Sequence, residues 1–427
     1  MAICAMLGHM SAPRQARGGV LVVGGGFAGA YVARELGGRG ATIVSKENFM
    51  LYTPLLPEAA SGTLEPRHCV VPLRVMCPHA ELILGSVNAV DLEARTVAVE
   101  TDEGPQTVGW RELVLALGAV PRTLPIPGLS EHALSFKSLA DAINLRNHVL
   151  HQLEAADAAL DEAERARRLT FVFVGAGYAG VEALPELSDL AEDALRYYPR
   201  LRATRRRWVL VDAAPRILPE IPPPLGDYAA AELRSREVEV HVETTLVSVS
   251  AGEAVLGDGT RVPTNTLVWT AGVAPNPLLR EWSLPLDERG RVEVDELLRV
   301  SGHEHVWALG DCARVPNTHS DRPDPPTCQH ALRQARRLAR NLVGPPEPYG
   351  YRMLGQVATL GRHKGIAEVL GLRLRGFLGW WVTRSYHLYQ LPLAQRKARV
   401  VVDWTVSLFF RRDIAELGQL GHPEKLG

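Results

Sequence analysis

The sequence is poor in cysteine and has almost no net charge. Its 427 residues include five cysteines, and none of these lies in a CxxC pair. This scarcity argues against a disulfide framework or a structural zinc and favours a reduced, cytosolic compartment. The formal net charge of -1 provides no general attraction to nucleic acid, so we expect no nucleic-acid partner.

Long apolar runs are also missing. No uncharged apolar run reaches the ~18 residues that a helix needs to cross a bilayer, so we expect no spanning segment. Residues 1–19 lack the basic start, apolar stretch and cleavage site of a secretory signal, and we expect them to form a disordered leader. The chain is longer than one hydrophobic core normally serves, so the remainder should form two or three domains.

A glycine motif occurs twice in the chain. The stretches "VLVVGGGFAGAYVAREL" (20–36) and "FVFVGAGYAGVEALPEL" (171–187) each join a β-branched run, a GxGxxG turn and a segment of helical period. The first glycine permits the tight bend, the second admits a pyrophosphate, and the third lets the helix pack on the strand. One copy is weak evidence because such turns are also plain connectors, whereas two copies with matching flanks predict two dinucleotide sites. The glycines are Gly24, Gly26 and Gly29 in the first copy and Gly175, Gly177 and Gly180 in the second.

Segments outside the two motifs complete an α/β organisation. Ser138 and Asp141 predict a capping box at the start of one charged helix over 138–168. Alternating apolar and polar residues around the "GDGT" turn predict an antiparallel, hairpin-bearing region over 237–272. We therefore expect two Rossmann-like dinucleotide-binding domains, followed by a C-terminal helical module.

The order of the segments carries a specific resemblance. The two glycine motifs, "LVLALGAVPRTLPIPG" (113–128), "LVWTAGVAPNPLL" (267–279) and "VWALGDCARVP" (306–316) occur in the order seen in the two-dinucleotide flavoprotein reductases. The resemblance implies that the protein binds FAD and NADH. It also implies that Gly310 and Asp311 close on the ribityl and pyrophosphate part of FAD, and that Gly118 and Gly272 belong to the cofactor sites.

Three further segments resemble the type II NADH:quinone oxidoreductases. The segment 48–66 is similar to their flavin-facing loop and implies that Thr53 and Pro54 lie at the isoalloxazine. The segment 325–342 is similar to their quinone-site helix and implies that Gln329 donates to a quinone carbonyl. The aromatic and basic stretch that begins at residue 377 resembles their membrane-docking tail. The implied activity is the transfer of a hydride from NADH to FAD, and of two electrons onward to a membrane quinone, without proton pumping.

The resemblance divides the chain into functional regions. The FAD-binding domain, which is discontinuous, is expected over 20–140 and 265–325, and the NADH-binding domain over 141–264. The region 326–427 is expected to form the quinone-site helix and a module for membrane docking or dimerisation.

Acidic residues distinguish the two nucleotide sites. A Rossmann unit places an acid at the end of its second strand to bind the ribose 2′-hydroxyl, and this acid repels a 2′-phosphate. Asp212 occupies this place in the second unit and favours NADH over NADPH, whereas Ser45 occupies it in the first. Glu182 follows the second motif, and the resemblance implies that it approaches the nicotinamide and flavin. The alternative is an acid favoured by the helix dipole, worth under about 1 kcal/mol. Glu182 and Gln329 are the candidate catalytic residues, and no metal site is expected.

Rival functions stay open. Sulfide:quinone oxidoreductases share the implied fold but use mid-chain and late-chain cysteines. No cysteine lies between Cys77 and Cys312, although Cys328 stands in the quinone-site segment where Ala is usual. Arg333 stands where a second Gln is common. A soluble NADH reductase of a protein electron carrier and a flavin-bearing redox sensor also fit the sequence.

The C-terminal segment fits an interfacial helix pair, aromatic on one side and basic on the other. We therefore expect peripheral attachment to the cytoplasmic face of a membrane. The same face would also suit a second subunit, so a homodimer is the alternative. The aromatic residues are Trp380, Trp381, Tyr386 and Tyr389, the basic ones are Arg384, Arg396, Lys397 and Arg399, and Val401, Trp404 and Leu408 continue the apolar face.

Overall fold

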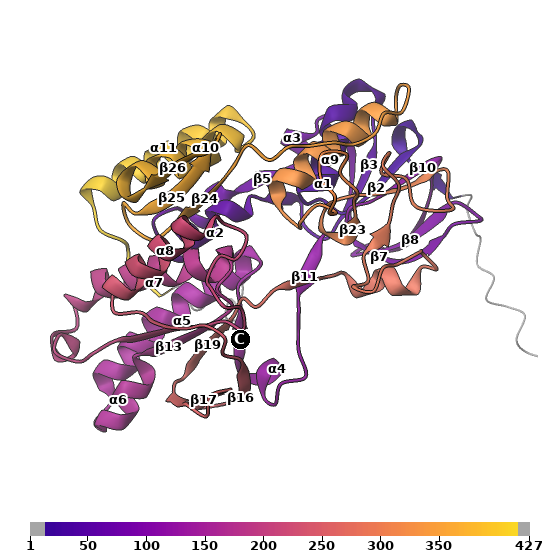
Figure 1. Cartoon of the computed structure of the whole chain (residues 1–427). Helices are drawn as coiled ribbons and strands as arrows, with labels where there is room; N and C mark the ends of the chain where they lie inside the picture. The colour runs from indigo at the N-terminus through magenta and orange to yellow at the C-terminus, as the bar shows by residue number, and fades with distance from the viewer. Residues whose placement is uncertain (1–12, 417–427) are drawn as a thin grey trace, which may run out of the picture. The chain divides into compact units, whose positions relative to one another are not determined.

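Figure 1 shows the computed structural model of the chain, in which residues 13–416 are described. Contacts between residues divide the chain into two compact units. The first unit comprises the described part of Met1–Leu51, with Val70–Val120 and Val273–Arg352. The second comprises Tyr52–Cys69, Pro121–Gly272 and the described part of Met353–Gly427.

This division differs from the expected domain boundaries at several places. Residues 121–140 and 265–272, expected in the FAD-binding domain, belong to the second unit, where β12 (Ala133–Ser135) pairs with β19 (Thr266–Trp269). Residues 326–352, expected in the C-terminal module, fold with the first unit because the helix α9 (Cys328–Asn341) packs on α1 (Phe27–Leu36). Residues 52–69, expected in the FAD-binding domain, fold with the second unit because α2 (Leu56–Ala60) packs on its helices α5 (Leu139–Ala158) and α7 (Tyr178–Leu195).

A five-stranded parallel sheet lies in the first unit, in the order β22-β10-β2-β3-β6. β2 and β3 are buried along their whole length, as is typical of the continuous apolar strands of parallel sheets. The strands are β2 (Val20–Val23), β3 (Thr42–Ser45), β6 (Glu81–Leu84), β10 (Glu112–Leu115) and β22 (Val306–Ala308). Smaller elements of this unit are α3 (Leu73–Met76), β4 (Phe49–Leu51), β5 (Val70–Pro72), β20 (Val273–Pro275), β21 (Val292–Glu293) and β23 (Ala313–Arg314).

The prediction of a disordered leader over residues 1–19 is wrong for its last residues, which form part of the fold. β1 (Arg14–Gln15) pairs with β9 (Gly104–Gly109) in a second sheet that continues through β8 (Thr96–Thr101) and β7 (Ser86–Asp91). Ala16 is buried, and its N–H donates to the Gly109 carbonyl at 2.8 Å. The unpaired edge of β9 offers backbone groups that capture this segment. Residues 1–12 of the expected leader lie outside the described residues.

The second unit repeats the parallel architecture in the order β12-β19-β13-β14-β15. α7 (Tyr178–Leu195) follows β13 and is buried over most of its length, and α8 (Pro223–Ser235) follows β14. An antiparallel sheet with the expected "GDGT" turn confirms the predicted hairpin. The antiparallel prediction is wrong for the two ends of the region 237–272, because β15 and β19 pair in the parallel sheet. The strands are β12 (Ala133–Ser135), β13 (Thr170–Val174), β14 (Arg207–Val211), β15 (Glu239–His241), β19 (Thr266–Trp269), and, in the antiparallel sheet, β16 (Leu246–Ser250), β17 (Glu253–Leu256) and β18 (Arg261–Pro263).

The charged segment before β13 forms two helices where one was predicted. The capping box is confirmed, because the Ser138 hydroxyl accepts from the Asp141 N–H and the Asp141 carboxylate accepts from the Ser138 N–H at the start of α5 (Leu139–Ala158). A second helix, α6 (Glu162–Arg168), begins after Asp161, whose carboxylate accepts from the Glu164 N–H at 2.9 Å. This local side-chain bond competes with a continuous helix and starts a new one.

The C-terminal part of the second unit contains a sheet that the sequence did not predict. β24 (Gly355–Thr359), β25 (Gly365–Val369) and β26 (Leu372–Arg375) form an antiparallel sheet, and α10 (Gly376–Gln390) packs on it. Figure 1 shows this sheet with α10 and α11 (Ala394–Phe409) in gold and yellow. Between residues 13 and 416, no helix combines the length and apolarity that a membrane span requires.

Candidate functional site

The first glycine turn has the geometry of a phosphate cradle. Gly24 has a φ of 112°, and a Cβ there would lie 2.2 Å from the Ala116 carbonyl oxygen. A Cβ on Gly29 would lie 1.9 Å from the Gly24 carbonyl oxygen, so the close packing of α1 on β2 needs glycine. A Cβ on Gly26, the N-cap of α1, would meet nothing within 4 Å, so the turn is open where the helix N-terminus offers its N–H groups.

Ser45 lies against this turn at the end of β3. A Cβ on Gly25 would come within 2.5 Å of the Ser45 Oγ, and this oxygen accepts from the Glu47 N–H at 3.3 Å. Ser45 therefore lies beside the first glycine turn, at the end of β3 where the sequence predicted it, and offers a hydroxyl in place of a carboxylate.

Gly310 and Asp311 lie beside the same turn. They form the 3-10 helix η7 (Gly310–Cys312), in which Gly310 has a φ of 73°. A Cβ on Gly310 would lie 3.1 Å from the Ala28 Cβ in the first turn of α1. Gly118, with a φ of 64°, contributes a backbone contact to the Cys312 thiol. The first unit thus brings together the expected residues Gly24, Gly26, Gly29, Ser45, Gly118, Gly310 and Asp311, and this set fits the adenosine and pyrophosphate part of FAD.

The second glycine turn has the same construction. Gly175 has a φ of 115°, and a Cβ on Gly180 would lie 2.0 Å from its carbonyl oxygen. The Thr270 hydroxyl donates to that oxygen at 2.8 Å, which ties the turn to the end of β19. Gly177 is the N-cap of α7, and a Cβ on it would meet nothing within 4 Å. Gly272, with a φ of 90°, follows two residues after Thr270.

Asp212 is held at this second turn. It follows β14, one carboxylate oxygen accepts from the Ala176 N–H inside the glycine turn, and the other accepts from the Ala214 N–H at 2.7 Å. Although the spacing from the motif is long, the 18 residues of α7 account for much of it. The acid therefore lies beside the turn, as predicted for a ribose-binding carboxylate.

Glu182 is buried on α7, with 8% of its surface exposed. Its Oε1 accepts from the Thr359 N–H at 2.9 Å and from the Thr359 hydroxyl at 3.3 Å. Burial raises the pKa of Glu182 to about 8, so the carboxyl group is protonated at neutral pH. Because Oε1 accepts both bonds, the proton belongs on Oε2. Thr359 lies at the end of β24. The sequence did not predict it as a partner of Glu182 because the sheet that contains β24 was not predicted.

Thr53 and Pro54 lie in the 3-10 helix η3 (Thr53–Leu55), which runs directly into α2. Glu58 of α2 is buried and accepts from the Arg384 Nε at 3.1 Å and from the Trp404 indole N–H. The ion pair joins the loop that carries Thr53 and Pro54 to the C-terminal helices α10 and α11.

The tail is only partly an outward-facing helix pair. The Arg384 side chain is 11% exposed, and its guanidinium lies 4.3 Å from the Trp380 ring and 4.7 Å from the Trp404 ring. Arg384 and Trp380 were expected on the basic and aromatic sides of an interfacial helix pair, and this prediction is wrong for both because their side chains are largely buried. Both side chains pack inward because Glu58 offers the arginine a buried anion. Trp381 and Tyr389 remain exposed, at 57% and 75%.

A large cavity lies in the second unit. It has a volume of about 780 Å³, which is within the range of small-molecule sites. Its lining is mainly apolar, with arginines at several points. The lining includes Leu64, Ile143, Arg146, Trp380, Val406 and Phe410.

Gln329 lies in the first turn of α9 in the first unit. It is half-buried, and its side-chain oxygen accepts from the Tyr351 hydroxyl at 3.3 Å. The Arg333 guanidinium lies 4.9 Å from the Tyr351 ring. Gln329 therefore reaches neighbouring groups by its oxygen and keeps an amide NH₂ as a donor.

The described cysteines are weakly acidic. Burial raises the pKa of Cys69, Cys77 and Cys328 to about 12, and that of Cys312 to about 11. These four thiols are therefore protonated at neutral pH and are poor nucleophiles.

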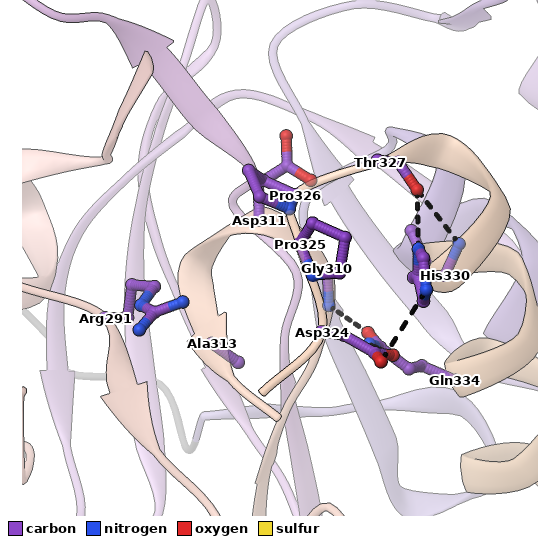
Figure 2. Close-up of a pocket in the computed structure, with 11 residues that line it drawn as sticks. Arg291, Gly310, Asp311, Ala313, Asp324, Pro325, Pro326, Thr327, His330 and Gln334 are labelled. Carbon is purple, nitrogen blue, oxygen red and sulfur yellow. Dashed lines mark hydrogen bonds and ion pairs between the residues drawn. The ribbon is translucent and has the colours of Figure 1, made fainter. Parts of the chain in front are cut away.

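Figure 2 shows a pocket of about 10 Å³ beside Gly310 and Asp311. Gln334 of α9 points into it, and its side-chain oxygen accepts from the Gly310 N–H at 2.8 Å. The Nε2 of the same Gln334 amide donates to the Asp324 Oδ2 at 2.9 Å. Neither residue was predicted from the sequence, and the position of Gln334 within the quinone-site segment was the available signal.

The chain is similar to known proteins in sequence and in fold. The sequence profile of the pyridine nucleotide-disulphide oxidoreductases matches residues 18–335. A probable NADH dehydrogenase of Dictyostelium discoideum is 32% identical over 88% of this chain and 85% of its own length. The type II NADH:quinone oxidoreductase NdhA of Mycobacterium tuberculosis is 31% identical over 92% of this chain and 87% of its own length. The structure of NDH2 from Plasmodium falciparum in complex with NADH superimposes with a TM-score of 0.87 at 18% identity, over 94% of this chain and 99% of that one, and supports the fold.

Proposed function

This chain belongs to the type II NADH:quinone oxidoreductases, within the pyridine nucleotide-disulphide oxidoreductases, and from this premise we propose that it oxidises NADH and reduces a membrane quinone without pumping protons. Bound FAD supplies the redox chemistry, accepting a hydride and passing on two electrons. The protein binds and orients the reactants and keeps water away from them.

The observation that carries this proposal is the difference between two glycine turns of the same construction. The second turn bonds its own N–H to the Asp212 carboxylate, whereas the first has Ser45 at that position. A carboxylate there binds a ribose 2′-hydroxyl and disfavours a 2′-phosphate. We therefore assign NADH to the second turn, with Gly175, Gly177, Gly180 and Gly272, and FAD to the first turn.

Further roles are assigned by the resemblance and supported by the local geometry. Thr53 and Pro54 lie at the isoalloxazine, on a loop that the buried Glu58–Arg384 pair holds in place. Glu182 contacts the nicotinamide as a neutral hydrogen-bond donor through Oε2, because Thr359 already occupies Oε1.

The quinone requires an apolar site and a hydrogen-bond donor. The amide NH₂ of Gln329 is the donor that we assign to a quinone carbonyl. The cavity of about 780 Å³ in the second unit is a separate candidate for the apolar site, because aromatic and aliphatic side chains line it together with arginines and carboxylates.

We further propose that the enzyme attaches peripherally to a membrane through α10 and α11, on the cytoplasmic face where NADH is available. Large apolar side chains on this part of the chain are exposed, which is typical of an interfacial surface. A homodimer through the same surface is the alternative. The exposed side chains include Phe377, Leu378, Trp381, Val402, Phe409 and Phe410.

One anaerobic titration tests the activity. NADH added to the purified yellow protein should bleach the flavin absorbance, and a soluble quinone analogue should then restore it. A flavin that does not bleach would overturn the dehydrogenase assignment, and bleaching without reoxidation by quinone would overturn only the acceptor. NADPH should bleach the flavin much more slowly than NADH because of Asp212.

Membrane attachment has a separate test. The native protein should pellet with anionic liposomes, whereas a variant with Phe409→Ser and Phe410→Ser should stay in the supernatant. The native protein could instead fail to pellet and sediment as a dimer, and the same variant could abolish this dimer. This result would indicate that the surface binds a second subunit and not a membrane.

The described cysteines oppose a sulfide substrate, because sulfide oxidation by this class of enzyme needs reactive thiols and burial keeps these four protonated. A soluble carrier protein as acceptor would be indicated by fast turnover with the carrier and none with quinone. Slow turnover with every acceptor, at full FAD occupancy, would indicate a redox sensor.

A further inference from the structure

Gln334 connects the Gly310–Asp311 turn of the first unit to the buried carboxylate of Asp324. Its Oε1 accepts from the Gly310 N–H at 2.8 Å, and its Nε2 donates to the Asp324 Oδ2 at 2.9 Å. The side chain is buried, with 2% of the residue exposed, and Figure 2 shows it between Gly310 and Asp324. A buried amide with a partner at each end is held in one position.

The chemistry of the two partners permits one orientation of this amide. The Gly310 N–H can only donate, and the Asp324 carboxylate accepts every hydrogen bond described for it. If the amide were flipped, its NH₂ would face the Gly310 N–H and its oxygen would face the carboxylate. Two buried polar groups would then lack partners, at a cost of about 1–3 kcal/mol each.

Asp324 is itself held by neutral donors. Its Oδ1 accepts from the Asn317 amide at 2.8 Å, and its Oδ2 accepts from the Tyr349 hydroxyl at 2.7 Å. His330 is the basic side chain closest to it, at 3.6 Å, and burial lowers the pKa of that histidine. Burying a carboxylate among neutral groups is costly, so Asp324 is better explained by a task other than stability.

The task follows from what Gly310 must do. Its φ of 73° is a conformation that glycine adopts readily, and glycine also leaves the backbone free to adopt others. The bond from Gln334 fixes the Gly310 N–H and therefore the direction in which the next residue, Asp311, leaves the turn. A Cβ on Gly310 would lie 3.1 Å from the Ala28 Cβ of α1 and 3.7 Å from the Ala331 Cβ of α9, so little room remains beside the turn.

We propose that Gln334, oriented by Asp324, is a positioning residue for the flavin: it holds the Gly310–Asp311 turn in the geometry that grips FAD. The inference rests on the proposed function, in which this turn binds FAD, and adds residues that the family resemblance did not indicate. α9 then has two roles, because the helix that presents Gln329 also holds the flavin turn through Gln334.

The test measures FAD retention. Gln334→Met keeps the length of the side chain and removes both hydrogen bonds, so we expect the Kd for FAD to rise about tenfold, which corresponds to about 1.4 kcal/mol. Asn341→Leu is the matched control, because it removes a buried amide of the same helix whose bonds go to the Leu297 and Glu347 carbonyls. The control should change the Kd less than twofold, even if the apoprotein melts at a lower temperature.

Two Asp324 variants separate positioning from general destabilisation. Asp324→Asn keeps an oxygen that can accept from the Gln334 amide and should retain FAD better than Gln334→Met. Asp324→Leu should weaken FAD binding about as much as Gln334→Met, and the double variant no more than either one, because the two residues act through a single contact. If Asp324→Leu does not fold, comparing the Kd for FAD of Asp324→Asn with that of Gln334→Met still distinguishes positioning of the turn from general destabilisation.

The outcomes are distinct from those that test the proposed function. An FAD Kd within twofold of native for Gln334→Met would overturn this inference, as would equal weakening by Gln334→Met and Asn341→Leu. A native protein that binds no FAD would overturn the proposed function instead.

Discussion

Replacing Glu182 by glutamine should stabilise the protein increasingly as the pH rises. Glu182 is buried on α7, burial raises its pKa from 4.5 to about 8, and Glu58 and Glu186 add to the increase. Below about pH 4.5 the carboxyl group is protonated in both the folded and the unfolded chain. Between about pH 4.5 and 8 the folded chain binds more protons, so the free energy of unfolding falls as the pH rises.

The magnitude follows from the width of this window. At pH 7.5 about three pH units have been crossed, and each is worth about 1.36 kcal/mol, so native Glu182 costs up to about 4 kcal/mol relative to a neutral side chain. Glutamine has no proton to lose and can accept the bond from the Thr359 N–H that Glu182 accepts at 2.9 Å. At roughly 2 °C per kcal/mol for a unit of this size, Glu182→Gln should raise Tm by about 8 °C at pH 7.5 and by little at pH 5.

The assay is thermal unfolding of the FAD-loaded protein from pH 5 to 8.5, with Glu192→Gln as control. Glu192 lies on the exposed part of the same helix and pairs with Arg206, so its replacement makes the same chemical change on the same helix without removing a buried acid. Parallel Tm profiles for native protein and Glu182→Gln would refute the reasoning. A stabilised Glu182→Gln that NADH bleaches more slowly would indicate that the costly acid is retained for function.

Three other predictions follow from the second unit. Asp212→Asn should raise the KM for NADH and lower the preference for NADH over NADPH, and an unchanged ratio of kcat/KM values would exclude the ribose contact. Arg412→Met should cost about 3–5 kcal/mol in thermal unfolding, because it leaves the buried Glu186 carboxylate unpaired, whereas Arg411→Met, whose side chain is 54% exposed, should cost under about 1 kcal/mol. Burial lowers the pKa of His148 to about 4, so stability should fall as the pH drops from about 6.5 to 4, and His148→Gln should reduce this loss in unfolding measured across that range.

Local sequence patterns sufficed for the elements whose geometry is local. Ser138 and Asp141 cap α5 as predicted, and both glycine turns join a buried strand to a helix with the positive φ angles that glycine permits. Asp212 was also placed correctly, because an acid at the end of the second strand of a Rossmann unit always comes next to the turn after the first.

Only the tertiary structure decided which charged residues are buried. Arg384 was expected on the basic side of an interfacial helix pair, and it pairs with Glu58, 326 residues away in sequence. Gln334 bonds to Gly310 across 24 residues, and Glu182 to Thr359 across 177. The pattern of polar residues along a helix is the same in the sequence whether a charged or amide side chain contacts water or a buried partner. The partner comes from a distant part of the chain, so folding alone assigns it.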